Sequence, residues 1–207
     1  MPFNFIMRKN TLKTLLALLP LSAMAQVPQG YWQQEVDYSI QITVSEKVNI
    51  NAVGRFETDQ RGQYLGHHLG AFHKGLPRDI LRFVHGDGRD PRLWHRVVQQ
   101  TAQLVGMALQ QEGYRGPAGI DAMIYRVGEK YKIRPIVEVN PRYTMGRIAA
   151  EISKHISSGQ SAYFGIAPTK NITPVAMKYQ KGRFHKGVLQ LTDPKYPFSA
   201  FLQVGID

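Results

Sequence analysis

The sequence contains no cysteine among its 207 residues. This absence excludes a disulfide framework, a thiolate zinc site and a cysteine nucleophile. Acidic residues are also scarce, since 15 Asp and Glu stand against 26 Lys and Arg and give a formal net charge of +11. The positive charge serves solubility, or it favours anionic partners such as nucleotides, nucleic acid or a membrane surface. Because the basic residues are spread along the chain, a phosphate-handling enzyme fits them at least as well as a DNA-binding protein does.

Several motifs of well-understood chemistry are missing too. The chain has no G-x-x-x-x-G-K-[ST] phosphate loop and no G-x-G-x-x-G dinucleotide fingerprint. It also lacks the G-x-S-x-G turn that exposes a nucleophilic serine. The hydrophobic fraction of 43% is ordinary, so the chain can build a core as one domain of usual size or two small ones.

The first 26 residues allow two interpretations. Basic residues precede a leucine-rich run at 15–21, which is too short to span a bilayer, and an A-x-A cleavage pattern ends at Ala25. These features are typical of a secretory signal. The leucines between Leu12 and Leu19 also repeat with helical spacing, and Pro20 would end such an amphipathic helix. The residues alone favour the signal, and the helix stays open.

Alternation of apolar and polar residues predicts most of the strands. It indicates strands at 36–44, 48–58, 119–127, 133–140 and 182–191. Because these strands come as hairpins, the fold class we expect is α+β, with an antiparallel sheet flanked by helices.

Two helices and three less regular segments complete the prediction. A helix from about residue 90 to 111 is expected to bury one stripe, and a second helix at 144–157 is expected to be capped by Thr144. Residues 59–77 read as loop or bent strand, 158–174 as irregular, and 192–207 as a short helix and a closing strand. The stripe expected on the first helix consists of Leu93, Val97, Thr101, Leu104 and Ala108.

The stretch VEVNPR holds the strongest chemical signal. Glu138 and Asn140 are two apart on a predicted strand and therefore point to the same side. If 119–127 and 133–140 form a hairpin, Asp121 lies opposite them and joins their face. Three oxygen ligands of this kind suit Mg²⁺, which keeps waters and takes phosphate oxygens as further ligands. Arg142 lies just past the strand end, where its planar fork can reach the same phosphates, and the helix that begins near Thr144 adds a dipole.

A plainer interpretation of the same residues stays open. Glu138 can lie on the solvent face of an amphipathic strand, and Asn140-Pro141 can simply make a turn. For an isolated E-x-N pattern this interpretation is favoured, and the spacing of Asp121 and Arg142 does not by itself decide between the two.

The segment GPAGIDAMIYR, together with IVEVNPRYTMGRIAAEI, resembles the C-terminal, Mg-ATP-binding portion of ATP-grasp enzymes. Within that superfamily it looks like the poorly characterised ligase-like members, and not like the D-alanine–D-alanine ligases or the biotin carboxylases. The resemblance extends over about residues 30–157 and is most specific at 113–150. In this superfamily an acid on one strand and an E-x-N pattern on the next hold two Mg²⁺ ions on ATP. The resemblance therefore implies that the metal ligands are Asp121, Glu138 and Asn140, with Mn²⁺ as an alternative ion.

The resemblance also implies roles for residues around the metal ligands. Arg142 matches the catalytic arginine that faces the γ-phosphate, and Val137 falls where the family has an apolar contact to adenine. The earlier stretch QQEVDYSIQITV is similar to the strand that follows the adenine hinge. Asp37 then stands at the acidic position of that strand, and Glu35 is a hinge or ribose contact.

The implied function is that of an ATP-dependent carboxylate–amine or carboxylate–thiol ligase, which acts through an acyl phosphate. The family's upstream lobe, with two lysines and a Gly-rich loop, has no counterpart before residue 30, so we expect a fragment with little activity alone. A separate chain could supply that lobe. ATP and an unidentified carboxylate are the expected partners, without nucleic acid or membrane. Whether the chain is itself an enzyme stays open.

The resemblance also reverses the preference at the N-terminus. A helix normally lies between the family's Gly-rich loop and its hinge strand, so the helix and a cytoplasmic location are now favoured. We expect a helix or signal-like segment at 1–26, the C-terminal lobe of an ATP-grasp fold at 27–160, and an extension at 161–207 that packs on the same domain. Two alternatives stay open, a secreted basic α+β binding protein with a cleaved signal and a non-catalytic relic of an ATP-grasp enzyme.

Overall fold

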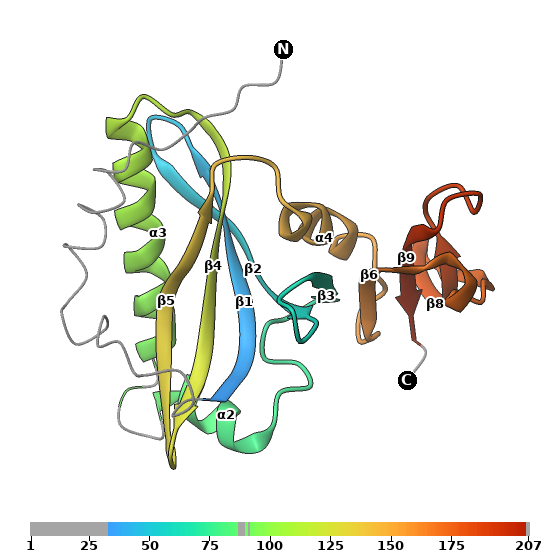
Figure 1. Ribbon diagram of the computed structural model, residues 1–207, viewed down its shortest axis with the longest axis horizontal. Helices are drawn as coiled ribbons and strands as arrows, with labels where there is room; N and C mark the ends of the chain where they lie inside the picture. The colour runs from blue at the N-terminus through green and yellow to red at the C-terminus, as the bar shows by residue number, and fades with distance from the viewer. Residues whose placement is uncertain (1–32, 87–89, 91, 206–207) are drawn as a thin grey trace. The chain divides into compact units, whose positions relative to one another are not determined.

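A computed structural model describes residues 33–86, 90 and 92–205 of the chain (Figure 1). The predicted N-terminal helix or signal at 1–26 lies outside these residues. The described strands all pair antiparallel, and helices accompany them, so the expected α+β fold class is confirmed. None of the described helices is long and apolar enough to cross a membrane.

The chain forms two compact units. The first comprises the described residues up to Ala52 together with Gly75–Thr144, and the second comprises Val53–Lys74 and the described residues from Met145 onward. Strand β2, Val48–Thr58, therefore begins in the first unit and ends in the second. The predicted domain bounds at residues 26 and 160 stay a prediction, because compactness alone does not define independently folding domains.

The first unit is a layer of strands covered on one face by helices. Along β1 apolar residues alternate with polar ones, and both kinds are buried at 38–42, where Tyr38, Ile40 and Ile42 form the apolar set. The long helix α3 runs along these strands in Figure 1, and its Trp94 ring lies 6.0 Å from the Tyr38 ring. The strands follow the order β5-β4-β1-β2. Their bounds and those of the helices are β1 Gln33–Val44, β4 Gly116–Val127, β5 Lys130–Asn140, α2 Arg78–Val84 and α3 Leu93–Gln111.

The stripe expected on α3 was wrong by one residue. Thr101 is buried as predicted, but the other predicted positions are only partly buried. The helix carries two apolar stripes side by side, and the stripe that is buried is the one next to the predicted stripe. It includes Trp94, and burial of this large side chain contributes most to the stability of the core. A Cβ on Gly106 would come within 2.4 Å of Val48, so α3 also approaches β2 closely. The buried positions are Trp94, Val98, Thr101, Ala102, Val105, Gly106 and Leu109.

The second unit is a sheet with one helix packed on it. Its strand order continues from β2 as β3-β6-β9-β8-β7. Its core is formed by seven buried side chains: Leu69, Ala149, Ile156, Ala162, Phe164, Leu202 and Val204. Its elements are β3 Tyr64–Leu69, α4 Met145–Ser153, β6 Ala162–Pro168, a 3-10 turn at Thr169–Asn171, β7 Val175–Gln180, β8 Arg183–Gln190 and β9 Phe198–Val204.

Three predictions for this unit need correction. Residues 158–174, expected to be irregular, contain the strand β6, and β7 was not identified. The short helix expected after residue 191 is absent from the described residues, which form bends and turns up to β9. The strand β6 was missed because Gly165 interrupts the apolar alternation on which the prediction rested. The structure needs a glycine there, since a Cβ would come within 2.6 Å of the Tyr163 ring. The predicted closing strand is confirmed by β9.

Candidate functional site

The hairpin β4–β5 aligns the predicted ligands as the sequence spacing requires. Asp121 pairs with Glu138, and Gly119 pairs with Asn140. Opposite residues of an antiparallel pair point to the same face, so all three oxygen-bearing side chains lie together. The register shifts between this site and Arg134, where Pro135 has no backbone N–H to donate to β4. The predicted hairpin geometry of Asp121, Glu138 and Asn140 is confirmed.

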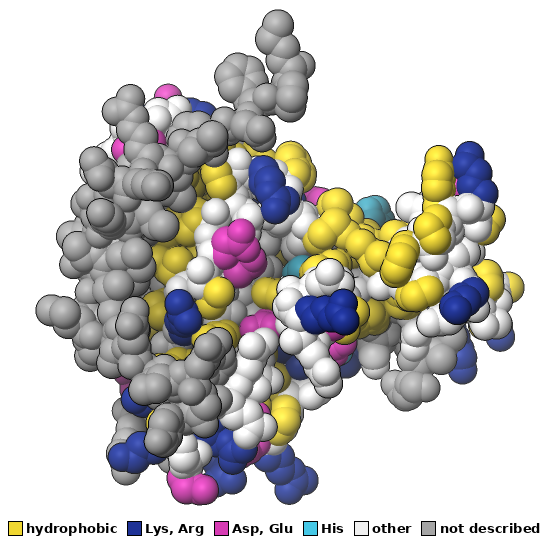
Figure 2. Space-filling view, in the orientation of Figure 1, with side chains coloured by type: hydrophobic (Ala, Val, Ile, Leu, Met, Phe, Trp, Pro, Cys, Tyr) yellow, Lys and Arg dark blue, Asp and Glu magenta, His cyan; other side chains and the backbone are white. Residues whose placement is uncertain are grey.

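Strand β1 adds its polar side to the same face. Ser39 lies opposite Asp121, and Asp37 lies opposite Met123. The apolar side of β1 packs toward α3, so its polar residues must point the other way. Figure 2 shows an isolated acidic area over this sheet, with basic side chains around it. Three neighbouring strands thus present carboxylates, an amide and a hydroxyl on one face.

Asn140 connects the acid to the arginine. Its Nδ2 donates a hydrogen bond to Asp121 Oδ2 at 3.2 Å, while its Oδ1 accepts one from Arg142 Nη2 at 3.1 Å. Asn140 is only 8% exposed, so its amide has little access to water and its orientation depends on these partners. The predicted group of Asp121, Asn140 and Arg142 is therefore in direct contact.

Asp121 has an unfavourable electrostatic environment as a carboxylate. Burial, which is the largest cause, and the nearby charges of Glu138 and Asp37 together raise its pKa from 3.8 to about 6. Arg142 lowers this pKa but does not offset the other effects. A carboxyl group that is buried among other acids attracts a cation, because a cation would relieve both the desolvation and the repulsion.

Three other predicted contacts lie on β1 and β5, and each has its own surroundings. Glu35 forms an ion pair with Arg126, with 3.0 Å between Oε1 and Nε, so its carboxylate is already neutralised by the chain. Val137 neighbours Glu138 on β5 and is 48% exposed, which leaves its side chain available to a ligand. Asp37 Oδ2 accepts a hydrogen bond from Gln34 Nε2 at 2.5 Å and also acts electrostatically on Asp121. The roles assigned to Glu35, Asp37 and Val137 stay predictions.

Gln41 belongs to this site although its residue type did not indicate a role. It is 2% exposed, donates to Ser39 Oγ at 3.0 Å and accepts from Thr144 Oγ1 at 2.7 Å. This buried chain of hydrogen bonds ties Thr144, the end of the segment that carries Asn140 and Arg142, to β1. The polar alternation of β1 was the available signal, since a glutamine on the same face as Ser39 must find partners there.

We expect Gly119→Ala to loosen this connection. A Cβ at residue 119 would lie 2.8 Å from Thr144 Cγ2 and 3.4 Å from Gln41 Nε2. Such overpacking costs about 1–3 kcal/mol, and here it also displaces the Thr144–Gln41 hydrogen bond. Urea unfolding monitored by circular dichroism would measure the loss.

Two further variants make the Gly119 experiment specific. Thr144→Ser removes Cγ2 but keeps the hydroxyl, so it should restore part of the stability that Gly119→Ala loses. Gly54→Ala is the matched control, because its Cβ would meet only His67 Cδ2, at an ordinary 3.5 Å. Equal destabilisation by Gly54→Ala and Gly119→Ala would contradict the assigned cause.

The donor set fits a hard cation that completes its shell with other ligands. Within the described part of the chain, no three His, Cys, Asp or Glu side chains are close enough to hold a metal ion by themselves. Asp121, Glu138 and Asn140 offer two carboxylates and one amide. Mg²⁺ is held in this way elsewhere, by one or two carboxylates with waters and substrate phosphates, whereas a structural zinc site would need more nitrogen or sulfur ligands.

No protein family model matches the sequence. No curated protein matches it either. Solved structures do resemble the chain. A protein assigned to the ATP-grasp superfamily from Archaeoglobus fulgidus has 13% identity and a TM-score of 0.43, with 84% of this chain and 46% of that chain covered.

Two carboxylases are also among the solved structures that match the chain. Biotin carboxylase from Campylobacter jejuni, solved in complex with β-γ-ATP, has 9% identity and a TM-score of 0.43, with 83% of this chain and 42% of that chain covered. The complete multifunctional pyruvate carboxylase from Rhizobium etli has 13% identity and a TM-score of 0.49, with 95% of this chain and 20% of that chain covered. The chain spans less than half the length of each of these three proteins.

Proposed function

We propose that the polar face of β1, β4 and β5 binds Mg²⁺ and the phosphates of ATP. The observation that carries this proposal is the cross-strand pair of Asp121 and Glu138, with Asn140 bonded to Asp121 at 3.2 Å. Carboxylates placed directly opposite each other repel, so the pair favours a state in which a cation lies between them. A bound cation supplies the missing positive charge.

Each predicted residue has a distinct role in the proposal. Asp121, Glu138 and Asn140 would hold the ion, which when bound neutralises charge that develops on the phosphates. Arg142 offers its guanidinium fork to a phosphate oxygen, and Val137 offers an exposed apolar surface to the base. Asp37 adds negative potential, and Glu35 holds Arg126.

The reaction we propose is ligation of a carboxylate to an amine or thiol. A carboxylate oxygen of the substrate forms a bond to the γ-phosphorus of ATP, and the bond to the β–γ bridging oxygen breaks, so ADP leaves. The amine or thiol then attacks the acyl carbon, and phosphate leaves with the bonding electrons. This chain supplies the cation and phosphate contacts. A further lobe, in the same or a separate chain, supplies the lysines, and we place the reaction in the cytoplasm.

The pH dependence of cation binding tests this proposal. Because the pKa of Asp121 is raised to about 6, its ionised fraction falls as the pH drops below that value. Mg²⁺ needs the ionised form, so its affinity should fall by about tenfold per pH unit below pH 6 and level off above pH 7. Calorimetric titration of MgATP at pH 5 to 8, in buffers of different ionisation enthalpy, would measure both the affinity and the proton released.

Two outcomes would contradict the proposal. Binding of ATP that is equally tight in the presence of EDTA would exclude the cation site. An affinity that does not change between pH 5 and pH 7 would exclude Asp121 as a ligand.

A further inference from the structure

The hairpin of β7 and β8 in the second unit carries four cations that have no counter-charge. Lys178, Lys181, Arg183 and Lys186, here called the basic hairpin, are all exposed. None of them forms an ion pair with a described carboxylate. Residues 170–195 contain six Lys and Arg but only one acid, Asp193, which pairs with Lys195 at 2.9 Å.

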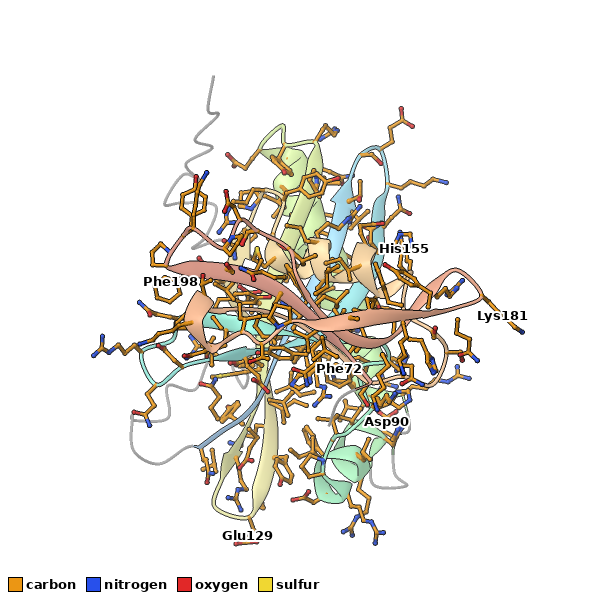
Figure 3. The ribbon with its side chains drawn as sticks, turned by 90° about the vertical axis from the view of Figure 1, so that its right-hand side faces the viewer. Phe72, Asp90, Glu129, His155, Lys181 and Phe198 are labelled. Atoms are coloured by element: carbon orange, nitrogen blue, oxygen red, sulfur yellow. The ribbon has the colours of Figure 1, made fainter. Side chains whose placement is uncertain are left out.

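The arrangement of these cations is unfavourable for the isolated fold. Lys178 lies directly opposite Lys186 in the β7–β8 ladder, and like charges at such positions destabilise a sheet. At the tip, Lys181 has a φ of 50° and is the one non-glycine residue with a positive φ in the described part of the chain. Turns of this type prefer asparagine, aspartate or glycine at that position. Figure 3 shows the Lys181 side chain extending from the tip into solvent.

Protection of a sheet edge explains only part of this pattern. Lysines on edge strands discourage aggregation, and β7 is the last strand in the described order. Lys178 on β7 fits that role. Lys186 does not, because β8 is paired on both sides, with β7 and with β9. A ligand that places negative charge between the two lysines would account for both of them.

The remaining features of β7 indicate what kind of anion fits. Tyr179 is 63% exposed and Val175 is 46% exposed, so apolar surface accompanies the charge. Among the described strands only β8 pairs with β7, which leaves the outer backbone edge at Lys178–Gln180 available for hydrogen bonds. Alternate residues of an added strand would face Lys178 and Tyr179 in turn, because successive side chains point to opposite faces.

We propose that the basic hairpin binds an extended, acidic polypeptide segment in which acidic and apolar residues alternate. The segment pairs with the outer edge of β7, its carboxylates face Lys178 and Lys186, and its apolar residues contact Tyr179. All residues of this binding site belong to the second unit, whereas those of the proposed cation and ATP site belong to the first.

A labelled peptide tests the proposal. Fluorescence anisotropy of a fluorescein-labelled peptide of alternating Glu and Val should rise on addition of the full chain, and the binding should weaken with salt. Lys178→Glu together with Lys186→Glu should weaken binding at least about tenfold, since two attractions become repulsions. The matched control is Lys130→Glu with Lys132→Glu, which changes the net charge equally on the hairpin β4–β5 and should leave binding unchanged.

The single variant Lys178→Glu shows whether weaker peptide binding comes from loss of the binding site or from unfolding of the protein. It replaces a like-charged cross-strand pair by an opposite one, so the urea midpoint should rise while peptide binding weakens. A peptide of the same composition with its Glu and Val residues in separate blocks should bind more weakly than the alternating one. Equal binding of both peptides, or tighter lysine-dependent binding of a single-stranded oligonucleotide, would overturn the proposal.

Discussion

Asp121→Asn is expected to weaken cation binding by about 100-fold or more and, at the same time, to stabilise the protein. The asparagine keeps an oxygen that can accept the bond from Asn140 Nδ2, so the contact at 3.2 Å survives. It cannot supply a carboxylate to a cation. Loss of a residue that only supports a metal ligand costs 10–100-fold in affinity, so loss of a ligand itself should cost about 100-fold or more. Titration with Mn²⁺ followed by electron paramagnetic resonance would count the bound ion.

The gain in stability follows from the raised pKa of Asp121. A group whose pKa is higher in the folded state stabilises the fold at low pH, and this contribution is lost as the pH rises. For Asp121 the contribution is complete below about pH 4 and gone above about pH 6. The shift from 3.8 to about 6 corresponds to about 3 kcal/mol, so the variant should gain about 1–3 kcal/mol at pH 7.

The gain should therefore depend on pH. Wild type and Asp121→Asn are expected to unfold at similar urea concentrations at pH 4, and the variant at a higher concentration at pH 7. Glu129→Gln is the matched control, because Glu129 lies at the tip of the same hairpin, far along the strands from Asp121 (Figure 3). If Asp121→Asn destabilises the protein at pH 7, the carboxylate is structural and the site is wrongly assigned.

The sequence predicted the site hairpin because both of its requirements are local. Strand alternation sets which side chains share a face. The turn at Gly128 alone would pair Asp121 with Ile136, and the register shift between Asp121 and Met123 moves it opposite Glu138 without changing the face. The chemistry then follows from residue types at fixed spacing. The hydrogen bonds of Asn140 did not follow from spacing, since they depend on where Arg142 lies after the strand has ended.

Other features could not be predicted because they depend on distant partners. The buried stripe of α3 is decided by contact of Trp94 with Tyr38 on another element, and two stripes of similar period compete in the sequence. Gln41 acquires its role only when Thr144, 103 residues later, lies beside it. Gly119 lets Thr144 come close to the strand, because it has no Cβ in the way. No local pattern in the sequence distinguishes such a glycine from one that only weakens a strand.

Arg142→Ala should change the affinities for the cation and for the nucleotide in opposite directions. Arg142 Nη2 holds the amide oxygen of Asn140 at 3.1 Å, and its charge acts on Asp121. For Asn140 to ligate an ion through that oxygen, this hydrogen bond has to break. Removal of the arginine frees the oxygen and takes away a competing positive charge, so Mg²⁺ alone should bind more tightly.

The same variant should bind the nucleotide more weakly. A charged hydrogen bond to phosphate is worth about 1.5–3 kcal/mol, so MgATP should bind about 10–100-fold more weakly to Arg142→Ala. Arg142→Lys keeps the charge but lacks the planar fork, so its affinity for MgATP should lie between those of the wild type and Arg142→Ala. Arg82→Ala, an exposed arginine on α2, is the control and should change neither affinity. Opposite shifts cannot arise from partial unfolding, which would lower both affinities. Parallel losses in Arg142→Ala would therefore show that Arg142 supports the fold and does not bind phosphate.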